Sequence, residues 1–456
     1  MNSRTISISL ALVFAMGLFT FSSGTAEENL RVGVFEVDAS PPVGSALAYD
    51  PTKGIQTPLS CRGIVIAGSG EPIVMVAVDW IGISNSGQTV FKEAIAGAVG
   101  TDLNRVVVHT LHQHDAPRCD FDAEVLIAEH GISGAGFDPD FARGVAENAA
   151  TAARVALADA QEVTHLGTGT GIVEKVASNR RILGPDGKVL HTRYTATKNE
   201  TVRAFPAGTI DPELKMITFW SGEKAIVALT YYATHPQSYY RTGLANPDFP
   251  GLARNAREAA TGIPHIHFNG AGGNIGAGKW NDGARENRQV LANRVAAGME
   301  KALAATAKTP IRAEDVEWGI EPVLLPVGKH LVASELEAKI KNKVETPGAR
   351  FGAAKALVWL QRCEAGDTIP ITCLTLKDAR ILHMPGELFV EYQLAGQKLR
   401  EDLFVAMAAY GDYAPGYIGT EIAYGQGGYE TSERASRVEP GVEKVLTEAV
   451  AKLLDR

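Results

Sequence analysis

Short apolar runs bounded by glycine and proline alternate with longer amphipathic stretches along most of the chain. β-Branched runs predict buried strands, and apolar positions that recur every three or four residues predict helices. Strands are expected at 30–37, 62–67, 73–78, 106–108, 211–220, 224–232, 263–268 and 374–382. Helices are expected at 88–99, 141–160, 249–261, 286–305, 332–360, 388–399 and 442–454. This mixture predicts an α/β protein with mixed β-sheets sandwiched by helices.

The first residues have the pattern of an export signal rather than of a folded element. Arg4 is followed by a mostly apolar stretch from Ile6 to Phe21 and by small residues that end at Ala26. This order is typical of a signal peptide at 1–26. We therefore expect an exported chain, periplasmic or secreted, in which residues 27–456 form a single domain. No second apolar stretch is long enough to predict a transmembrane segment in the mature chain.

Composition narrows the classes of partner. The formal net charge is −8, and hydrophobic and charged residues make up 45% and 21% of the chain, as in an ordinary globular enzyme. The negative charge gives no electrostatic reason to expect nucleic acid as a partner. Cys363 and Cys373 lie close enough in sequence for a bridge in an exported protein, but sequence does not decide the pairing of the four cysteines.

The densest group of chemically active residues follows the apolar run 106–108. His109, His112 and His114 occur within six residues, with Asp115 beside them. If the strand continues in extended form, residues i and i+2 point to the same side, so His112 and His114 would face one site. Hydrogen-bonded polar residues at a strand end are the alternative, but such a cluster favours a metal or acid/base role. A further histidine, His235, also follows an apolar run and would supply another ligand.

Several later segments carry candidate groups of other kinds. The stretch 269–283 holds six glycines and contains GxxxxGK, but Trp280 stands where a nucleotide-binding loop needs a hydroxyl. We interpret it instead as a loop whose backbone passes close to other atoms, with N–H groups free for an anion or oxyanion. Arg180 and Arg181 open a turn, and Glu387 follows a strand as either a helix N-terminal carboxylate or a metal ligand. Five of the twelve tyrosines lie between 410 and 429.

Taken in order, HQHDAP at 112–117, THPQS at 234–238, the glycine-rich loop, MPGELF at 384–389 and YIGT at 417–420 resemble the neutral ceramidase family. The resemblance covers nearly all of the mature chain. It implies one zinc ion per chain, held by His112, His235, Glu387 and Tyr417. It also implies that His114 and Tyr429 lie near the reacting carbonyl and that Arg180 orients the substrate, which would be a small-molecule or lipid N-acyl compound.

Two departures from the family pattern change the picture. Gly276 stands where the family has a loop serine, and we expect the chain, which ends at Arg456, to lack the family's C-terminal immunoglobulin-like domain. We therefore expect an exported zinc-dependent hydrolase that cleaves an amide, with activated water as the nucleophile. The alternatives are a zinc-dependent esterase or lactonase, and a binding protein without catalysis. A barrel amidohydrolase fits the strand order poorly. The chain contains no GxSxG motif, so a serine hydrolase is not supported either.

Overall fold

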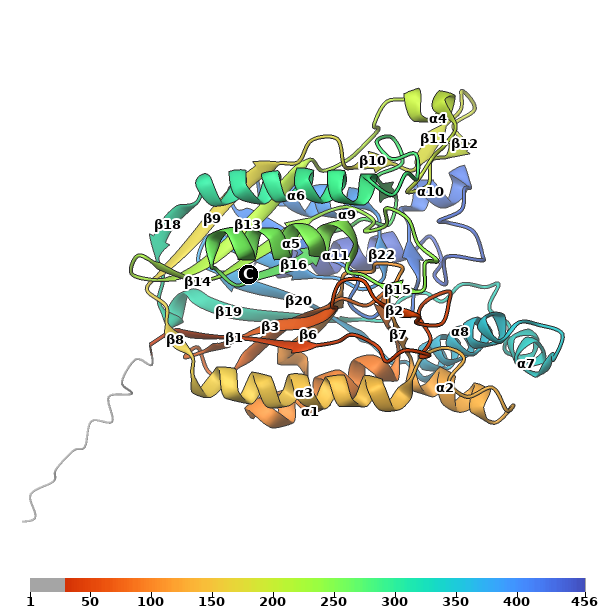
Figure 1. The fold of residues 1–456 in the computed structure, drawn as a ribbon, viewed down its shortest axis with the longest axis horizontal. Helices are drawn as coiled ribbons and strands as arrows, with labels where there is room; N and C mark the ends of the chain where they lie inside the picture. The colour runs from red at the N-terminus through yellow and green to blue at the C-terminus, as the bar shows by residue number, and fades with distance from the viewer. Residues whose placement is uncertain (1–28, 456) are drawn as a thin grey trace, which may run out of the picture.

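Residues 29–455 are described in the computed structural model, and they are built around three β-sheets (Figure 1). The first sheet has the order β6-β4-β3-β1-β8, with β1 Arg31–Asp38, β3 Ser60–Ala67, β4 Ile73–Val78, β6 Val106–Thr110 and β8 Gln161–Glu162. The second has the order β16-β14-β13-β9-β18, with β9 His165–Ile172, β13 Glu213–Ser221, β14 Lys224–Tyr232, β16 His265–Asn269 and β18 Ala307–Pro310. The third has the order β19-β20-β21-β23, with β19 Val316–Val323, β20 Ile369–Leu376, β21 Ala379–His383 and β23 Phe404–Ala408.

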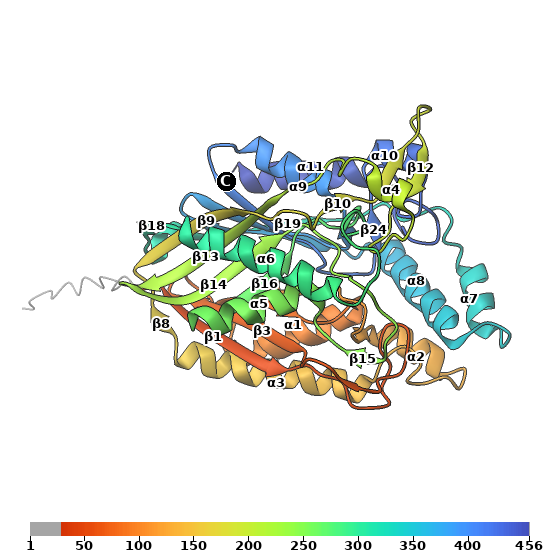
Figure 2. The ribbon, with the colours of Figure 1, turned by 45° about the horizontal axis from the view of Figure 1, so that its top comes forward.

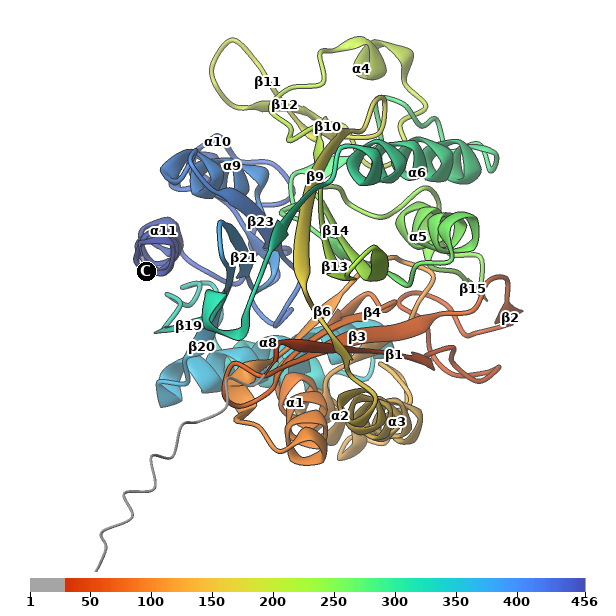
Figure 3. The same cartoon turned by 90° about the vertical axis from the view of Figure 1, so that its left-hand side faces the viewer.

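Helices cover the outer face of each sheet, as the end-on view in Figure 3 shows. The first sheet is covered by α1 (Ser86–Val99) and α3 (Pro139–Ala158), the second by α5 (Asp248–Thr261) and α6 (Asn287–Ala304), and the third by α9 (Val390–Leu399) and α11 (Val442–Leu454). Figure 2 shows α7 (Ala333–Lys341) and α8 (Pro347–Ala365) projecting beside α2 (Phe121–Ala128). Short helices are α4 Glu200–Ala204, α10 Glu421–Gln426 and the 3-10 turns Leu103–Arg105 and Ala313–Asp315. The predicted fold class is confirmed.

Five two-stranded ribbons complete the chain, and several of them lie at the right-hand end of the molecule in Figure 1. They pair β2 (Gly54–Ile55) with β15 (Leu244–Ala245), β5 (Gly82–Ile83) with β7 (Arg118–Cys119), β10 (Ser178–Asn179) with β17 (Ile275–Gly276), β11 (Arg181–Leu183) with β12 (Val189–Thr192), and β22 (Glu387–Leu388) with β24 (Tyr417–Ile418). These ribbons position loops rather than build the core.

The inner faces of the three sheets share one apolar core. Ile64 of the first sheet, Phe219 of the second and Ile381 of the third belong to the same buried cluster, and each is fully buried. Burying a side chain of this size stabilises the fold by about 1.5–3 kcal/mol. Because one cluster joins all three sheets, the ends of their central strands are fixed relative to one another.

Each sheet also contains one parallel strand pair: β4 with β6, β14 with β16, and β21 with β23. The carboxyl ends of parallel strands meet at one edge of a sheet, where loops of the two strands can combine into a site. The histidine-rich segment follows β6, His235 follows β14, and Glu387 follows β21. The three parallel pairs therefore bring chemically active loops from three sheets to one place.

Three predicted elements are wrong in detail. The strand expected at 374–382 is the hairpin of β20 and β21, because Lys377 adopts a left-handed φ of 55° and reverses the chain without interrupting the apolar alternation. The helix expected at 332–360 is broken before Pro347, where the Thr346 side chain caps α8. The helix expected at 388–399 begins only at Val390. Glu387 is thus a strand residue and not a helix N-terminal carboxylate.

Other expectations concern the termini and the cysteines. The predicted signal segment, 1–26, lies outside the described residues. Among the helices of residues 29–455, none has the length and hydropathy needed to cross a membrane. Cys363 on α8 and Cys373 on β20 are not joined by a disulfide, so the bridge considered between them is not formed.

Two core histidines make stability depend on acidity. Burial lowers the pKa of His109 to about 4 and that of His267 to about 3. A depressed histidine pKa stabilises the fold above the unfolded value of about 6.5, and that contribution is lost as pH falls toward the folded value. Lowering the pH from 7 to 5 should therefore cost about 2 kcal/mol per histidine.

Urea unfolding at the two pH values measures this loss. His267→Gln should remove about half of the loss assigned to the two histidines, whereas His130→Gln, at a half-buried position on the loop after α2, serves as the control and should leave the loss unchanged. An unchanged pH dependence in His267→Gln would contradict the assignment.

Candidate metal centre and active site

The candidate site is assembled from loops that leave one strand of each sheet. His112 and His114 follow β6, His235 follows β14, and Glu387 follows β21. The imidazole rings of His112 and His114 lie 5.0 Å apart, and those of His112 and His235 lie 4.7 Å apart. The structure therefore brings together the residues that the sequence singled out.

The backbone at His112 reaches this position in an unexpected way. β6 ends at Thr110, and His112 adopts a φ of 62°, a left-handed conformation that a non-glycine residue rarely takes. The extended continuation expected for this segment is therefore wrong, although His112 and His114 still face one another. Such strained conformations persist where the surrounding structure over-determines them, as often happens at functional sites.

Three buried nitrogen and oxygen atoms of the kind that bind metals converge at one point, and none of them has a hydrogen-bond partner among the described residues. His112 Nε2 lies 3.2 Å from Glu387 Oε2, and His235 Nδ1 lies 3.8 Å from the same oxygen. None of these three atoms has a hydrogen-bond partner, and each residue is at most 2% exposed. Buried polar atoms are normally paired, so three orphans at one point indicate a missing binding partner.

The donor set fits a divalent metal such as zinc. Imidazole nitrogen and carboxylate oxygen are zinc ligands, and bonds of about 2.0–2.1 Å in a tetrahedron place neighbouring donors about 3.3 Å apart. The His112–Glu387 separation of 3.2 Å is close to that spacing. His112 Nδ1 donates to the backbone oxygen of Ile81 at 2.6 Å, which leaves the Nε2 lone pair directed toward the centre.

Glu387 is the negative charge of the site. Burial alone would raise its pKa, but His112 and the hydroxyls of Tyr413 and Tyr417 lower it below the usual value. Tyr413 donates its hydroxyl to Glu387 Oε1 at 2.6 Å, which leaves Oε2 for the unpaired side of the site. Glu387 is therefore a carboxylate near neutral pH, as a metal ligand must be.

Tyr417 reaches the site through the β22–β24 ribbon, in which it pairs with Glu387 in parallel register. Its ring stacks on that of His235 at an interplanar angle of 3°, and its hydroxyl oxygen accepts a hydrogen bond from Arg180 at 3.0 Å. Burial raises the pKa of Tyr417 well above its usual value. The structure thus places all four residues predicted as ligands together.

His114 belongs to the same buried cluster in a different way. His112, His114 and His235 could by themselves hold a metal ion, since their ring nitrogens lie within 4.8 Å of one another. His114, however, is paired at both nitrogens: Nδ1 with the Tyr49 hydroxyl and Nε2 with His235 Nε2, each at 3.0 Å. Glu387 Oε2 has no hydrogen-bond partner, whereas both nitrogens of His114 have one. We therefore favour Glu387 over His114 as the third ligand. Burial, followed by the nearby His112, keeps the pKa of His114 well below its usual range.

Arg180 brings a buried positive charge next to the ligand set. Its Nε forms an ion pair with Glu430 Oε1 at 3.0 Å, and its guanidinium lies over the rings of Tyr194, Tyr417 and Tyr429 at 5.4–5.8 Å. Burial would lower the pKa of Arg180, but Tyr417 and Glu430 outweigh burial and raise it. Arg180 is thus held in one orientation with its charge intact.

The glycine-rich loop packs against the segments that carry the ligands. A Cβ on Gly273 would lie 2.2 Å from the backbone oxygen of Glu387, and one on Gly272 would lie 2.7 Å from the backbone of Thr234. The expectation of a close backbone approach is confirmed. Four backbone N–H groups of the loop donate hydrogen bonds within the chain: those of Gly270, Ala271, Gly273 and Ile275. These four groups are therefore not free to bind an anion, whereas the sequence predicts free N–H groups for the loop.

Gly276 itself does not require glycine. A Cβ there would meet Thr195 Cγ2 at 3.3 Å and Arg180 Cγ at 3.5 Å, and its φ is not positive. We expect Gly276→Ser to keep the free energy of unfolding within about 1 kcal/mol, with metal content unchanged and activity within about threefold.

Gly278→Ser is the matched control, because its Cβ would lie 1.8 Å from the backbone oxygen of Tyr194 and should cost more than about 2 kcal/mol. Urea unfolding and substrate turnover measure both variants. A large gain in turnover for Gly276→Ser would contradict the expectation that a loop serine is dispensable.

Four residues of the site were not predicted: Tyr49, Tyr410, Tyr413 and Glu430. Tyr410 stacks on His112 with ring centroids 4.7 Å apart, and Glu430 is fully buried between Arg180 and Arg181. The tyrosine-rich stretch gave a signal for Tyr410 and Tyr413, and Glu430 adjoins the predicted Tyr429. Nothing in the local sequence marks Tyr49.

Asp79 and the candidate His109 lie outside the group of unpaired atoms and have other roles. Asp79 forms a two-pronged ion pair with Arg254, at 2.7 and 2.9 Å, and ties the end of β4 to α5. His109 donates from Nδ1 to the backbone oxygen of Ala409 at 2.7 Å and does not reach the unpaired donors. Both residues support the fold around the site.

Known proteins resemble this chain in fold rather than in sequence. No model of a protein family matches the chain, and no curated protein matches it. A solved structure described as ceramidase complexed with C2 matches with a TM-score of 0.67 at 17% identity, over 94% of this chain and 76% of the other. The fold resembles that of ceramidases. Neutral ceramidase from Pseudomonas aeruginosa matches with the same TM-score and identity, over 94% of this chain and 75% of the other.

The observed topology also excludes one competing fold class. The described residues form three mixed sheets, two of five strands and one of four, and no eight-stranded parallel barrel. The His-x-His segment follows a strand at the edge of the first sheet rather than the first strand of a barrel. The barrel amidohydrolase alternative is therefore ruled out.

Proposed function

We propose that the protein is an exported, zinc-dependent hydrolase that cleaves the amide bond of an N-acyl substrate. The observation that carries this proposal is the convergence of unpaired donor atoms from His112, His235 and Glu387 beside the buried Arg180. The similarity in fold to neutral ceramidases supports the choice of an amide. Export rests on the sequence of residues 1–26 alone.

The proposed zinc ligands are His112, His235, Glu387 and Tyr417, with one ion per chain. Nitrogen and oxygen donors of this kind suit zinc, and the ionised Glu387 supplies the negative charge. When bound, zinc supplies Lewis acidity that polarises an acyl carbonyl and makes water a nucleophile near neutral pH.

The surrounding side chains have separate proposed roles. Arg180 donates a hydrogen bond to the Tyr417 hydroxyl, and its guanidinium lies over the rings of Tyr194 and Tyr429. It can therefore orient an acyl oxygen and stabilise developing negative charge. The neutral His114, which the Tyr49 hydroxyl fixes in orientation, is proposed to exchange its Nε2 contact with His235 for a hydrogen bond to the reacting group. Tyr429 is half-buried beside Tyr417, with ring centroids 5.7 Å apart, and its hydroxyl is proposed to contact the scissile carbonyl.

Aromatic side chains at the rim favour an apolar acyl group. Tyr49 and Tyr240 are 42% and 40% exposed, their rings lie 5.0 Å apart, and both rings contact the ring of His114. Exposed aromatic rings that adjoin a polar site provide apolar area for a ligand. We therefore propose a lipid or another N-acyl small molecule as the substrate.

The test is hydrolysis by the purified full chain. Fatty acid released from a long-chain ceramide is measured with and without a zinc chelator, alongside the matched long-chain ester. Chelator-sensitive release from the amide, with one zinc per chain, is the expected result. Faster release from the ester would favour an esterase or lactonase, and zinc binding without hydrolysis of either compound would favour the binding protein.

A further inference from the structure

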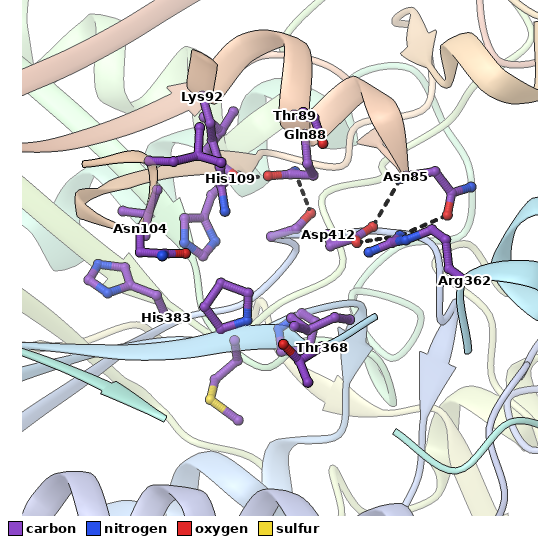
Figure 4. Close-up of a pocket in the computed structure, with 18 residues that line it drawn as sticks. Asn85, Gln88, Thr89, Lys92, Asn104, His109, Arg362, Thr368, His383 and Asp412 are labelled. Carbon is purple, nitrogen blue, oxygen red and sulfur yellow. Dashed lines mark hydrogen bonds and ion pairs between the residues drawn. The ribbon is translucent and has the colours of Figure 1, made fainter. Parts of the chain in front are cut away.

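A second polar cavity lies between α1, β6 and the end of β21, where Gly411 and Asp412 also line it (Figure 4). Its volume is about 200 Å³. Gln88, Thr89 and Lys92 line it from one face of α1, together with Asn85, which directly precedes the helix. None of the proposed zinc ligands lines this cavity, so it is separate from the metal centre.

The cavity contains one positive charge that the structure does not balance. Arg362 is matched by Asp412, whose two oxygens accept from Arg362 at 2.8 Å and from the N–H groups of Asn85 and Ala414. The half-buried Lys92 has no hydrogen-bond or ion-pair partner among the described residues. Burial lowers the pKa of Lys92, and Asp412, the carboxylate that opposes this effect, is already paired, which leaves the ammonium available to a ligand.

Neutral polar groups stand around the same space. His383 is 3% exposed, and its Nε2 is buried without a hydrogen-bond partner. Figure 4 shows Lys92, Asn104, His109 and His383 gathered on one side of the cavity, with the Arg362–Asp412 pair on the other. Burial keeps the pKa of His383 well below its usual range, so the imidazole is neutral and adds no charge. An unpaired buried polar atom is costly unless a ligand or water satisfies it.

Most of the remaining wall is apolar. It includes Leu103, Val107, Ile369, Met384 and Pro385, and Thr368 adds one neutral hydroxyl. No carboxylate other than the paired Asp412 faces the space. A single uncompensated cation beside apolar walls is matched by a monoanion with a short hydrocarbon part, better than by a dianion or a neutral molecule.

From this arrangement we propose that the cavity is a binding site for a short aliphatic carboxylate, whose oxygens contact the Lys92 ammonium and the neutral donors near it. A water molecule occupies about 30 Å³ in the liquid, so the space accepts roughly six or seven groups of that size. Butyrate, with about six heavy atoms, fits that estimate. This assignment does not depend on the proposed hydrolytic activity.

The test is calorimetric titration of the full chain, as purified, with sodium butyrate, butyramide and sodium phosphate. Butyrate should bind at one site per chain in addition to any binding at the metal centre, and butyramide, which has the same shape without the charge, should not. Lys92→Met should weaken butyrate binding at least about tenfold. The control Lys343→Met, at an exposed position before α8, should bind butyrate as the unaltered chain does.

Thermal unfolding shows whether Lys92→Met still folds. The variant should melt at the same temperature as the unaltered chain or higher, because it removes an unpaired, half-buried ammonium while keeping an unbranched side chain. Butyrate binding that persists unchanged in Lys92→Met, equal binding of butyramide, or tighter binding of phosphate would each overturn the proposal.

Discussion

Replacing His112 with alanine is expected to abolish both stoichiometric zinc and hydrolysis. The His112 Nε2 atom is 3.2 Å from Glu387 Oε2, and a hydrogen bond from Nδ1 to the Ile81 backbone oxygen holds it there, so the substitution removes a fixed donor atom from the site. Glu387→Gln should have a similar effect, since an amide keeps the shape but removes the charge that binds the metal. Loss of a ligand should weaken zinc binding by more than about 100-fold, beyond the loss typical of outer-shell residues.

Metal analysis and turnover are measured together on these variants. His267→Gln is the matched control, because His267 is equally buried but pairs with Thr230 and Asn269 away from the site. It should keep full zinc occupancy. Full zinc occupancy in both His112→Ala and Glu387→Gln would remove the ligand assignment, even if activity were lost.

Replacing Arg180 with methionine should reduce kcat/KM by about 10²–10³-fold while zinc content stays at one per chain. The buried guanidinium lies beside Tyr417 and is not a metal donor, so its removal takes away stabilisation of charge rather than the metal. Arg180→Lys should not restore activity, because a lysine ammonium cannot contact Tyr417 and Glu430 at once as the planar guanidinium does.

The same substitution leaves Glu430 with only Arg181, at 3.5 Å, and should cost about 3 kcal/mol in stability. The double variant Arg180→Met/Glu430→Gln separates this effect from catalysis. It should recover most of the free energy of unfolding but not the turnover. Recovery of turnover in the double variant would show that Arg180 acts only by neutralising Glu430.

Local pattern was sufficient for the strands that carry the site. The runs before His112 and His235 are apolar and β-branched, and they fold as β6 and β14, since burial of such runs is favoured in any arrangement of sheets. Pattern failed at one turn that contains no glycine or proline. Lys377 reverses the chain between β20 and β21 inside an alternating stretch, and the sequence offered no sign of it.

The roles within the site show the same division. The sequence placed His112, His114, His235, Glu387 and Tyr417 among the candidate groups because each follows a strand or lies in a distinctive motif. It did not find Tyr49, which contacts His114 from 65 positions away in the sequence. It also did not find Glu430, which pairs with Arg180 from 250 positions away. Such partners are chosen by tertiary packing, which local spacing does not encode.

The sequence by itself determined an α/β chain of mixed strands and helices, and it identified the nitrogen, oxygen and guanidinium groups available for metal chemistry. Only the tertiary structure decided that three parallel strand pairs end at one place and leave His112 Nε2, His235 Nδ1 and Glu387 Oε2 unpaired together. It also revealed the separate cavity at Lys92. The physical reason is that residue type and periodicity fix local conformation and burial. Which buried polar atoms meet, and which lack a partner, depends on packing between the sheets.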